Sequence, residues 1–307
     1  MKTTYHLCWS CDNELLFRTR EDYIHGIVCL CIAAHEAEMR LLAYCLMSNH
    51  VHICIRGSNL KKFTKAFRYS YTRYFNSKYN RRGRLGERNF FKLEIQGLAH
   101  LLTAIAYILR NPLHHGICKT PFEYEFSSVN AAFVKELGHM AATGKLPFCQ
   151  LPSRHKLPSH VVTGYNGVPL AASIIDVNDI EHQFSTVRTY LYFMNRLSGE
   201  SWEKEQETDK NGLPPIRLYD IEAGVKGTDI THMLSNENGR NRNMKLDDIA
   251  LCELIEALIG KLYKGETPYT LPEKKLNRIA EIIKEQNSIS AEQLSRCLPG
   301  LRYAKRR

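Results

Sequence analysis

The sequence predicts an α+β fold, in which an antiparallel sheet carries helices on one face and a mostly helical C-terminal region follows. Three observations lead to this prediction. Residues 50–56 alternate between polar and apolar side chains, as the two faces of a strand do. Residues 21–38 and 98–110 instead repeat their apolar side chains at helical spacing. The expected order over residues 3–110, β-α-β-β-α-β-α, suits a ferredoxin-like or RRM-like sheet.

The first elements follow from short apolar segments separated by polar ones. Residues 3–9 predict a strand, and residues 15–17 predict a short strand after a polar loop. Residues 21–38 predict an amphipathic helix, whose apolar face consists of Tyr23, Ile27, Leu30 and Ala34. The elements expected next are a strand at 39–47, a turn at 48–49, the strand at 50–56, a helix at 60–80, a strand at 90–95 and the helix at 98–110.

Length and composition limit the class of protein. A chain of 307 residues suggests about two domains, and 44% hydrophobic residues are enough for a core. The sequence has no apolar run of about 18 residues and no signal peptide, so we expect a cytoplasmic protein outside the membrane. Ten scattered cysteines do not suggest a disulfide framework in that compartment. Cys8 and Cys11 with Cys29 and Cys31 could hold zinc, although small core residues are the favoured interpretation.

Positive charge is concentrated in one segment. Residues 56–92 contain twelve Lys and Arg against the single Glu87, so their net charge of +11 exceeds the +10 of the whole chain. Seven Phe and Tyr at 63–79 lie among these cations, and about half of these seven rings are expected in the core. Cations that bind phosphates and rings that stack on bases suit single-stranded or hairpin DNA. The predicted DNA-binding residues are Lys61, Lys62, Lys65, Arg68, Arg73, Arg81, Arg82, Arg84 and Arg88. The alternative is a merely solvated face.

Two motifs carry candidate chemistry. His50 and His52 lie at i, i+2 on one face of a strand, where two imidazoles can bind one divalent metal ion. Tyr107 and Asn111 lie at i, i+4 on one face of the helix at 98–110, opposite its apolar stripe. Pro112 predicts that this helix ends at Asn111. The alternatives are strand histidines without a metal and a tyrosine that only packs.

The two motifs together resemble a known family. The sequence Met-Ser-Asn-His-Val-His-Ile at 47–53 and the segment at 104–117 resemble the HUH (His-hydrophobe-His) single-tyrosine transposases, in particular the REP-associated tyrosine transposases. The resemblance covers residues 4–130. It implies a nucleophilic Tyr107 and a Mg²⁺ or Mn²⁺ ion held by His50, His52 and Asn111. It also implies cleavage and rejoining of single-stranded or hairpin DNA through a 5′-phosphotyrosine, and a possible homodimer.

Two other functions are compatible with these motifs. One is a DNA-binding regulator that derives from a transposase and no longer cleaves. The other is a replication initiator or relaxase that uses the same chemistry, although no helicase motif is present. No Walker-type glycine loop is present either, so no nucleotide cofactor is expected.

The rest of the chain divides into two further parts. After a catalytic domain at 1–145, we expect a linker and helical extension at 146–245, which includes a helix at 179–196. Residues 246–307 predict three helices, at 246–263, 272–286 and 291–297, the last opened by a capping box at Ser290. A helix-turn-helix module that contacts DNA is one interpretation of this part. The alternative is a three-helix packing domain without DNA contacts.

Overall fold

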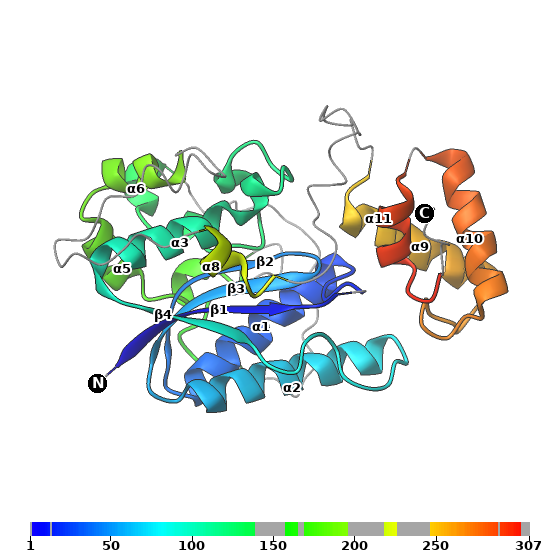
Figure 1. The fold of residues 1–307 in the computed structure, drawn as a ribbon, viewed down its shortest axis with the longest axis horizontal. Helices are drawn as coiled ribbons and strands as arrows, with labels where there is room; N and C mark the ends of the chain where they lie inside the picture. The colour runs from blue at the N-terminus through cyan, green and yellow to red at the C-terminus, as the bar shows by residue number, and fades with distance from the viewer. Residues whose placement is uncertain are drawn as a thin grey trace.

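The computed structural model describes residues 2–12, 14–138, 157–164, 169–195, 218–225, 246–287 and 289–301 of the chain. Its centre is a four-stranded antiparallel sheet in the order β2-β3-β1-β4 (Figure 1). The strands are β1 (Thr3–Ser10), β2 (Arg40–Leu46), β3 (His50–Gly57) and β4 (Phe91–Ile95). The predicted α+β class and antiparallel sheet are confirmed.

Three long helices complete the N-terminal part. They are α1 (Arg20–Glu36), α2 (Leu60–Lys78) and α3 (Gly97–His114), so the predicted order β-α-β-β-α-β-α is confirmed. The short strand predicted at 15–17 is wrong. The backbone N–H groups of Leu16 and Phe17 both donate to the Ser48 carbonyl, at 2.8 and 3.0 Å. These apolar side chains are buried in a loop, and burial alone produced the strand-like pattern.

Helix α1 begins at a capping arrangement. Asp22 accepts hydrogen bonds from the backbone N–H groups of Arg18 and Thr19, at 2.9 and 3.0 Å. Thr19 is the N-cap residue, so its bond satisfies a donor at the start of the helix that has no intrahelical partner. The same buried carboxylate accepts from the Tyr79 hydroxyl at 2.7 Å and from the Lys78 ammonium at 2.8 Å. Asp22 therefore ties the start of α1 to the end of α2.

Helices cover both faces of the sheet, and the prediction that they lie on one face is wrong (Figure 1). Helix α2 packs on the face that carries Trp9, whose ring lies 5.8 Å from the Phe67 ring. Helix α3 packs on the opposite face, where the Tyr107 ring lies 5.2 Å from the His52 ring. The polar side chains of the alternating pattern, His50 and His52, lie on the face that α3 covers and are buried as well.

Helix α3 is longer and more buried than predicted. It continues through Pro112 to His114, so the prediction that it ends at Asn111 is wrong. A proline in the last turn removes only one backbone donor, and its neighbour Asn111 still accepts from His115 N–H at 3.0 Å. Residues 101–112 are all buried, because helices α5 (Val177–Phe184) and α6 (Val187–Met194) also pack against α3. The polar stripe of α3 faces the sheet rather than solvent.

The extension contributes to the same core as the sheet. Ile180, Phe184, Tyr190 and Met194 of α5 and α6 belong to the main hydrophobic cluster. The single helix predicted at 179–196 is wrong, because Ser185 adopts a left-handed φ of 62° between α5 and α6. Shorter helices are η1 (Pro121–Glu123), η2 (Val129–Ala131), α4 (Val134–Leu137), η3 (Ala171–Ser173) and α8 (Leu218–Glu222). Most of the predicted linker and loops within 146–245 lie outside the described residues.

The predicted helical C-terminal region is confirmed. Its helices are α9 (Asp248–Leu262), α10 (Glu273–Gln286) and α11 (Ala291–Cys297), which we call the three-helix unit. As predicted, Ser290 caps α11, with its side chain accepting from Gln293 N–H at 3.1 Å. The unit has a hydrophobic cluster of its own, into which Leu15 of the N-terminal part inserts. Within the described residues, no helix has the length and apolar character needed to cross a membrane.

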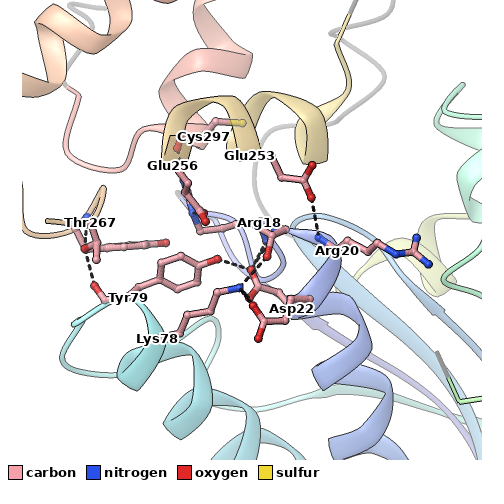
Figure 2. Close-up of polar contacts among 12 residues, drawn as sticks. Arg18, Arg20, Asp22, Lys78, Tyr79, Glu253, Glu256, Thr267 and Cys297 are labelled. Atoms are coloured by element: carbon pink, nitrogen blue, oxygen red, sulfur yellow. Dashed lines mark hydrogen bonds and ion pairs between the residues drawn. The ribbon is translucent and has the colours of Figure 1, made fainter. Parts of the chain in front are cut away.

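Polar contacts hold the three-helix unit against the N-terminal part (Figure 2). The fully buried guanidinium of Arg18 donates to the Cys297 carbonyl at 2.9 Å and to Glu256 at 3.3 Å. It also lies 5.5 Å from the centre of the Tyr79 ring. The Thr267 hydroxyl donates to the Tyr79 carbonyl at 2.6 Å. A buried cation with several partners fixes this interface in one arrangement.

Candidate active site

The two histidines of β3 lie side by side on the face that α3 covers. Both are fully buried, and their ring centres are 4.9 Å apart. β3 is paired on both edges, with Ser10 of β1 opposite His50 and Cys45 of β2 opposite His52. A strand between two neighbours is the most rigid position in this sheet, so the spacing of the two imidazoles is set by the backbone.

Asn111 of α3 reaches the same place. Its Oδ1 atom lies 2.9 Å from the Nε2 atom of His50, while the Nδ1 atom of His50 lies 2.8 Å from the Oδ1 atom of Asn49. If Nδ1 donates its proton to Asn49, the Nε2 lone pair faces the oxygen of Asn111. Two lone pairs at this separation repel each other unless a cation lies between them. Neighbouring ligands in an octahedral Mg²⁺ shell are about 3 Å apart, so the pair has suitable spacing for such an ion.

His52 supplies a third donor atom. Its Nδ1 atom lies 3.0 Å from the Nε2 atom of His6, and its own Nε2 atom has no hydrogen-bond partner among the described residues. Burial, followed by the neighbouring His50, lowers the pKa of His52 well below its usual value. Burial also lowers the pKa of His6 to about 3. A neutral imidazole whose second nitrogen bonds to a partner is the usual form of a metal-binding histidine.

Tyr107 lies over the two-histidine face. Its ring is 5.2 Å from His52 and 6.1 Å from His6, and the side chain is only 5% exposed. Its hydroxyl donates to Glu222 Oε1 at 3.3 Å. Burial and the charge of Glu222 raise the pKa of Tyr107 well above its usual value. The phenol is therefore protonated at neutral pH, and it needs a proton acceptor before it can act as a nucleophile.

Residues 218–225 close this side of the site. Glu222 bonds to Tyr107 and also pairs with His114 Nε2 at 3.0 Å. Gly224 accepts from the Ser10 hydroxyl at 2.9 Å, and a Cβ on Gly224 would lie 2.4 Å from the Cβ of Phe91. The close approach of this segment therefore requires a glycine.

The basic residues of α2 lie on the far side of the sheet from His50. Lys61, Lys65 and Arg73 are exposed along one stripe of the helix, with Tyr69 between them at 67% exposure. Lys62 is also exposed and donates to the Glu36 carbonyl at 2.5 Å, while Arg68 is half-buried. More of the seven rings at 63–79 are buried than the half that was predicted, since five of them lie in the core. The buried rings are Phe63, Phe67, Tyr71, Phe75 and Tyr79.

The loop after α2 lies closer to the site than α2 does. The N–H of Glu87 donates to the Ser10 carbonyl at 2.8 Å, at the end of β1 that pairs with His50. Arg82, Arg84 and Arg88 are exposed on this loop. Arg81 differs from them. It forms an ion pair with Glu14 and donates to the Gly83 and Arg84 carbonyls, at 3.4 and 2.9 Å, so its role in the structure is to hold the loop.

The described residues of the three-helix unit have no excess of positive charge. Helices α9 to α11 with their connections, residues 246–301, contain seven Lys and Arg and nine Asp and Glu, a net charge of −2. The long polar side chains of α11, Gln293 and Arg296, are buried and bond to Asp248, at 3.2 Å for Gln293. The basic tail at 302–307 lies outside the described residues. The three helices of the helix-turn-helix prediction are therefore present, but Gln293 and Arg296 of α11 point into the unit rather than toward solvent.

The cysteines do not gather around a metal. Cys8, Cys11, Cys29 and Cys31 are buried free thiols, and burial raises the pKa of Cys31 to about 11. Within the part of the chain that the structure describes, no three His, Cys, Asp or Glu side chains form a metal-binding group. The set of His50, His52 and Asn111 has only two such residues and an amide.

Comparison with known proteins finds similarity in the N-terminal part. Residues 1–110, about a third of the chain, match the family described as "Transposase IS200 like". The structure of a REP-associated tyrosine transposase bound to a REP hairpin is 14% identical, covering 45% of this chain and 80% of that chain with a TM-score of 0.35. A Deinococcus radiodurans r1 crystal structure assigned to the transposases is 18% identical. It covers 33% of this chain and 85% of that chain, with a TM-score of 0.23. No curated protein matches the chain. The N-terminal third of this chain is therefore similar in sequence to the IS200-like transposases.

Proposed function

We propose that this protein is a transposase, which cleaves and rejoins single-stranded DNA through a covalent 5′-phosphotyrosine intermediate on Tyr107. One observation carries the proposal. The ring of Tyr107 lies against His52, and Asn111, one helical turn later, meets His50. A nucleophile and three donor atoms from two separate elements thus converge at one buried point.

The proposed reaction exchanges one phosphoester for another. The Tyr107 oxygen attacks the scissile phosphorus and forms a bond to it, while the bond from phosphorus to the 3′ oxygen breaks. The departing oxygen takes a proton from water and becomes a 3′-OH. The Glu222 carboxylate, to which the hydroxyl donates, is within reach to accept the phenolic proton. Rejoining reverses these steps, and because the phosphoester bond is conserved, no nucleotide cofactor is needed.

The donor set suits a hard divalent cation. His50 Nε2, His52 Nε2 and Asn111 Oδ1 would hold it, and Mg²⁺ or Mn²⁺ fits nitrogen and amide-oxygen ligands with water completing the shell. Such an ion would polarise the phosphate and stabilise charge on the leaving oxygen. The fit is supported by the 2.9 Å approach of His50 Nε2 to Asn111 Oδ1 and by the His52 Nε2 atom, which has no hydrogen-bond partner among the described residues.

The DNA path that we propose has two sections. Arg82, Arg84 and Arg88 would bind phosphates beside the cleavage site, because their loop bonds to the end of β1 next to His50. The stripe on α2, with Tyr69 as a stacking ring, would hold a more distant part of a single strand or hairpin. Formation of a homodimer stays a prediction from the family resemblance.

A labelled oligonucleotide separates this function from the two alternatives. After cleavage, the 5′-phosphate side of the break is bound to the protein, so a 3′ label should stay with the protein under denaturing conditions. A 5′ label should leave with the 3′-OH product. A regulator without cleavage would bind the hairpin and give no adduct. A replication initiator would form the adduct, but it would not transfer the held strand to a second DNA molecule to complete transposition.

A further inference from the structure

The turn between β2 and β3 sets the position of His50. Ser48 and Asn49 form this turn, which is closed by a 2.8 Å bond from Met47 N–H to the His50 carbonyl. The Asn49 side chain bonds to His50 Nδ1 at 2.8 Å, and the backbone carbonyl of Asn49 accepts from Cys11 N–H at 2.8 Å. Any shift of this turn would therefore move both the backbone of His50 and the partner that orients its ring.

The three-helix unit forms a hydrogen bond with this turn. The Ser48 hydroxyl donates to Asp248 Oδ2 at 2.8 Å, across 200 residues of sequence. Asp248 is 8% exposed at the start of α9, where Arg296 Nε donates to the same oxygen at 2.8 Å. A buried carboxylate with a paired guanidinium and a helix N-terminus behind it is a fixed acceptor. Ser48 is thus held by a group that cannot easily move.

A second contact fixes the other side of the turn. The Ser48 carbonyl accepts from Leu16 and Phe17 N–H, and the next residue, Arg18, enters the three-helix unit (Figure 2). Leu15 packs in the hydrophobic cluster of that unit. The unit therefore holds the turn from both sides, through Asp248 and through residues 15–18.

We propose that the three-helix unit supports the metal-binding turn, and that Ser48 and Asp248 are positioning residues for His50. This inference rests on the proposed function, in which His50 binds a metal ion. It explains why α11 keeps its polar side chains inward, toward Asp248, and why the packed unit is net acidic although its chain acts on DNA. Reading DNA would require the opposite arrangement.

Two single-hydroxyl variants of the full chain test the inference. Ser48→Ala removes the bond to Asp248 and leaves the Asp248–Arg296 pair in place. Thr267→Val is the matched control, because it removes another hydroxyl that joins the same unit to the N-terminal part, at Tyr79 and away from His50. Mn²⁺ affinity is measured without DNA, from the electron paramagnetic resonance signal of free Mn²⁺, and thermal unfolding is measured in parallel.

We expect Ser48→Ala to weaken Mn²⁺ binding about 3- to 10-fold. This is less than the loss in affinity expected when a residue that bonds directly to a metal ligand is removed. Thr267→Val should lower the melting temperature similarly and leave Mn²⁺ affinity unchanged. Equal Mn²⁺ affinities in both variants and the parent, or equal losses in both, would overturn the positioning role. His52→Ala separates the two proposals: if it leaves Mn²⁺ binding intact, the proposed metal site itself is wrong.

Discussion

The Nε2 atom of His50 lies 2.9 Å from the Oδ1 atom of Asn111, so β3 and α3 meet at one buried point although 61 residues separate the two side chains. Neither element could hold this contact alone. β3 is fixed by its two neighbouring strands, and α3 is fixed by packing between the sheet and helices α5 and α6. The site is therefore a product of the whole core, and changes to ligands and to supports can be separated by experiment.

The first prediction concerns the metal ligands. His50→Ala and His52→Ala should each reduce metal-dependent cleavage by at least about 100-fold, because an imidazole is lost from the first shell. Asn111→Ala should reduce metal-dependent cleavage about 10-fold, and excess Mn²⁺ should partly restore it, since water can replace a neutral amide oxygen. His160→Ala, at an exposed histidine, is the control. Cleavage that is unaffected by both β3 substitutions would exclude this metal site.

The second prediction concerns the interface in Figure 2. Arg18→Met should lower the free energy of unfolding by about 3 kcal/mol, because it leaves the partly buried Glu256 and the Cys297 carbonyl without their cation. Arg40→Met is the matched control, since Arg40 is 56% exposed and its pair with Asp176 should contribute about 1 kcal/mol or less. Urea denaturation measures both. Similar losses in the two variants would show that the Arg18 interface is not a specific contact.

The third prediction concerns pH. Burial holds the pKa of His6 at about 3 in the folded protein, below the 6.5 of the exposed side chain. A lowered pKa gives stability that is fully present above pH 6.5 and is lost as the pH falls toward 3. In metal-free buffer, the parent should therefore lose about 1 kcal/mol more than His6→Gln for each pH unit between 6 and 4. If the free energy of unfolding fell equally with pH in the parent and in His6→Gln, a buried neutral His6 would be contradicted.

The fourth prediction separates the two sections of the DNA path. Replacing Arg82, Arg84 and Arg88 with Ala should reduce the salt dependence of binding by about two units of slope for short and long oligonucleotides alike. Replacing Lys61, Lys65 and Arg73 should do so only for oligonucleotides long enough to reach α2. Tyr69→Ala should weaken the binding of long oligonucleotides by about 1–3 kcal/mol and leave the salt dependence of that binding unchanged. If the α2 variant also changed the slope for the shortest cleavable oligonucleotide, the two-section path would be wrong.

The sequence predicted local features well and tertiary ones less well. Strand alternation and helical spacing identified the strands, the long helices and the convergence of His50, His52 and Tyr107 on one site. His6 and Glu222 were missed, because contact with the site depends on strand pairing for His6 and on the packing of residues 218–225 for Glu222. The burial of the polar stripe of α3 was missed too, since nothing local shows that α5 and α6 cover its apolar side.

Arg81 shows a further limit of sequence reasoning. It belongs to the basic segment by composition, but in the structure it pairs with Glu14, which lies 67 residues away. A count of charges cannot distinguish a cation that is free to bind phosphate from one that holds a loop. The same holds for the helix-turn-helix interpretation of residues 246–307, because a helical pattern does not show that Gln293 of α11 bonds to Asp248.

Tyr107→Phe tests the central claim most directly. The substitution removes only the hydroxyl, and the ring can still pack against His52 and His6, so folding and DNA affinity should be unchanged. With a 3′-labelled hairpin and Mn²⁺, we predict a labelled covalent adduct on the parent and none on the variant. Among the next candidates, Tyr71 and Tyr74 bond to Leu16 and Asp22 on the other side of the sheet, and Tyr69 faces solvent. An adduct on the Tyr107→Phe protein would contradict the account and place the nucleophile elsewhere.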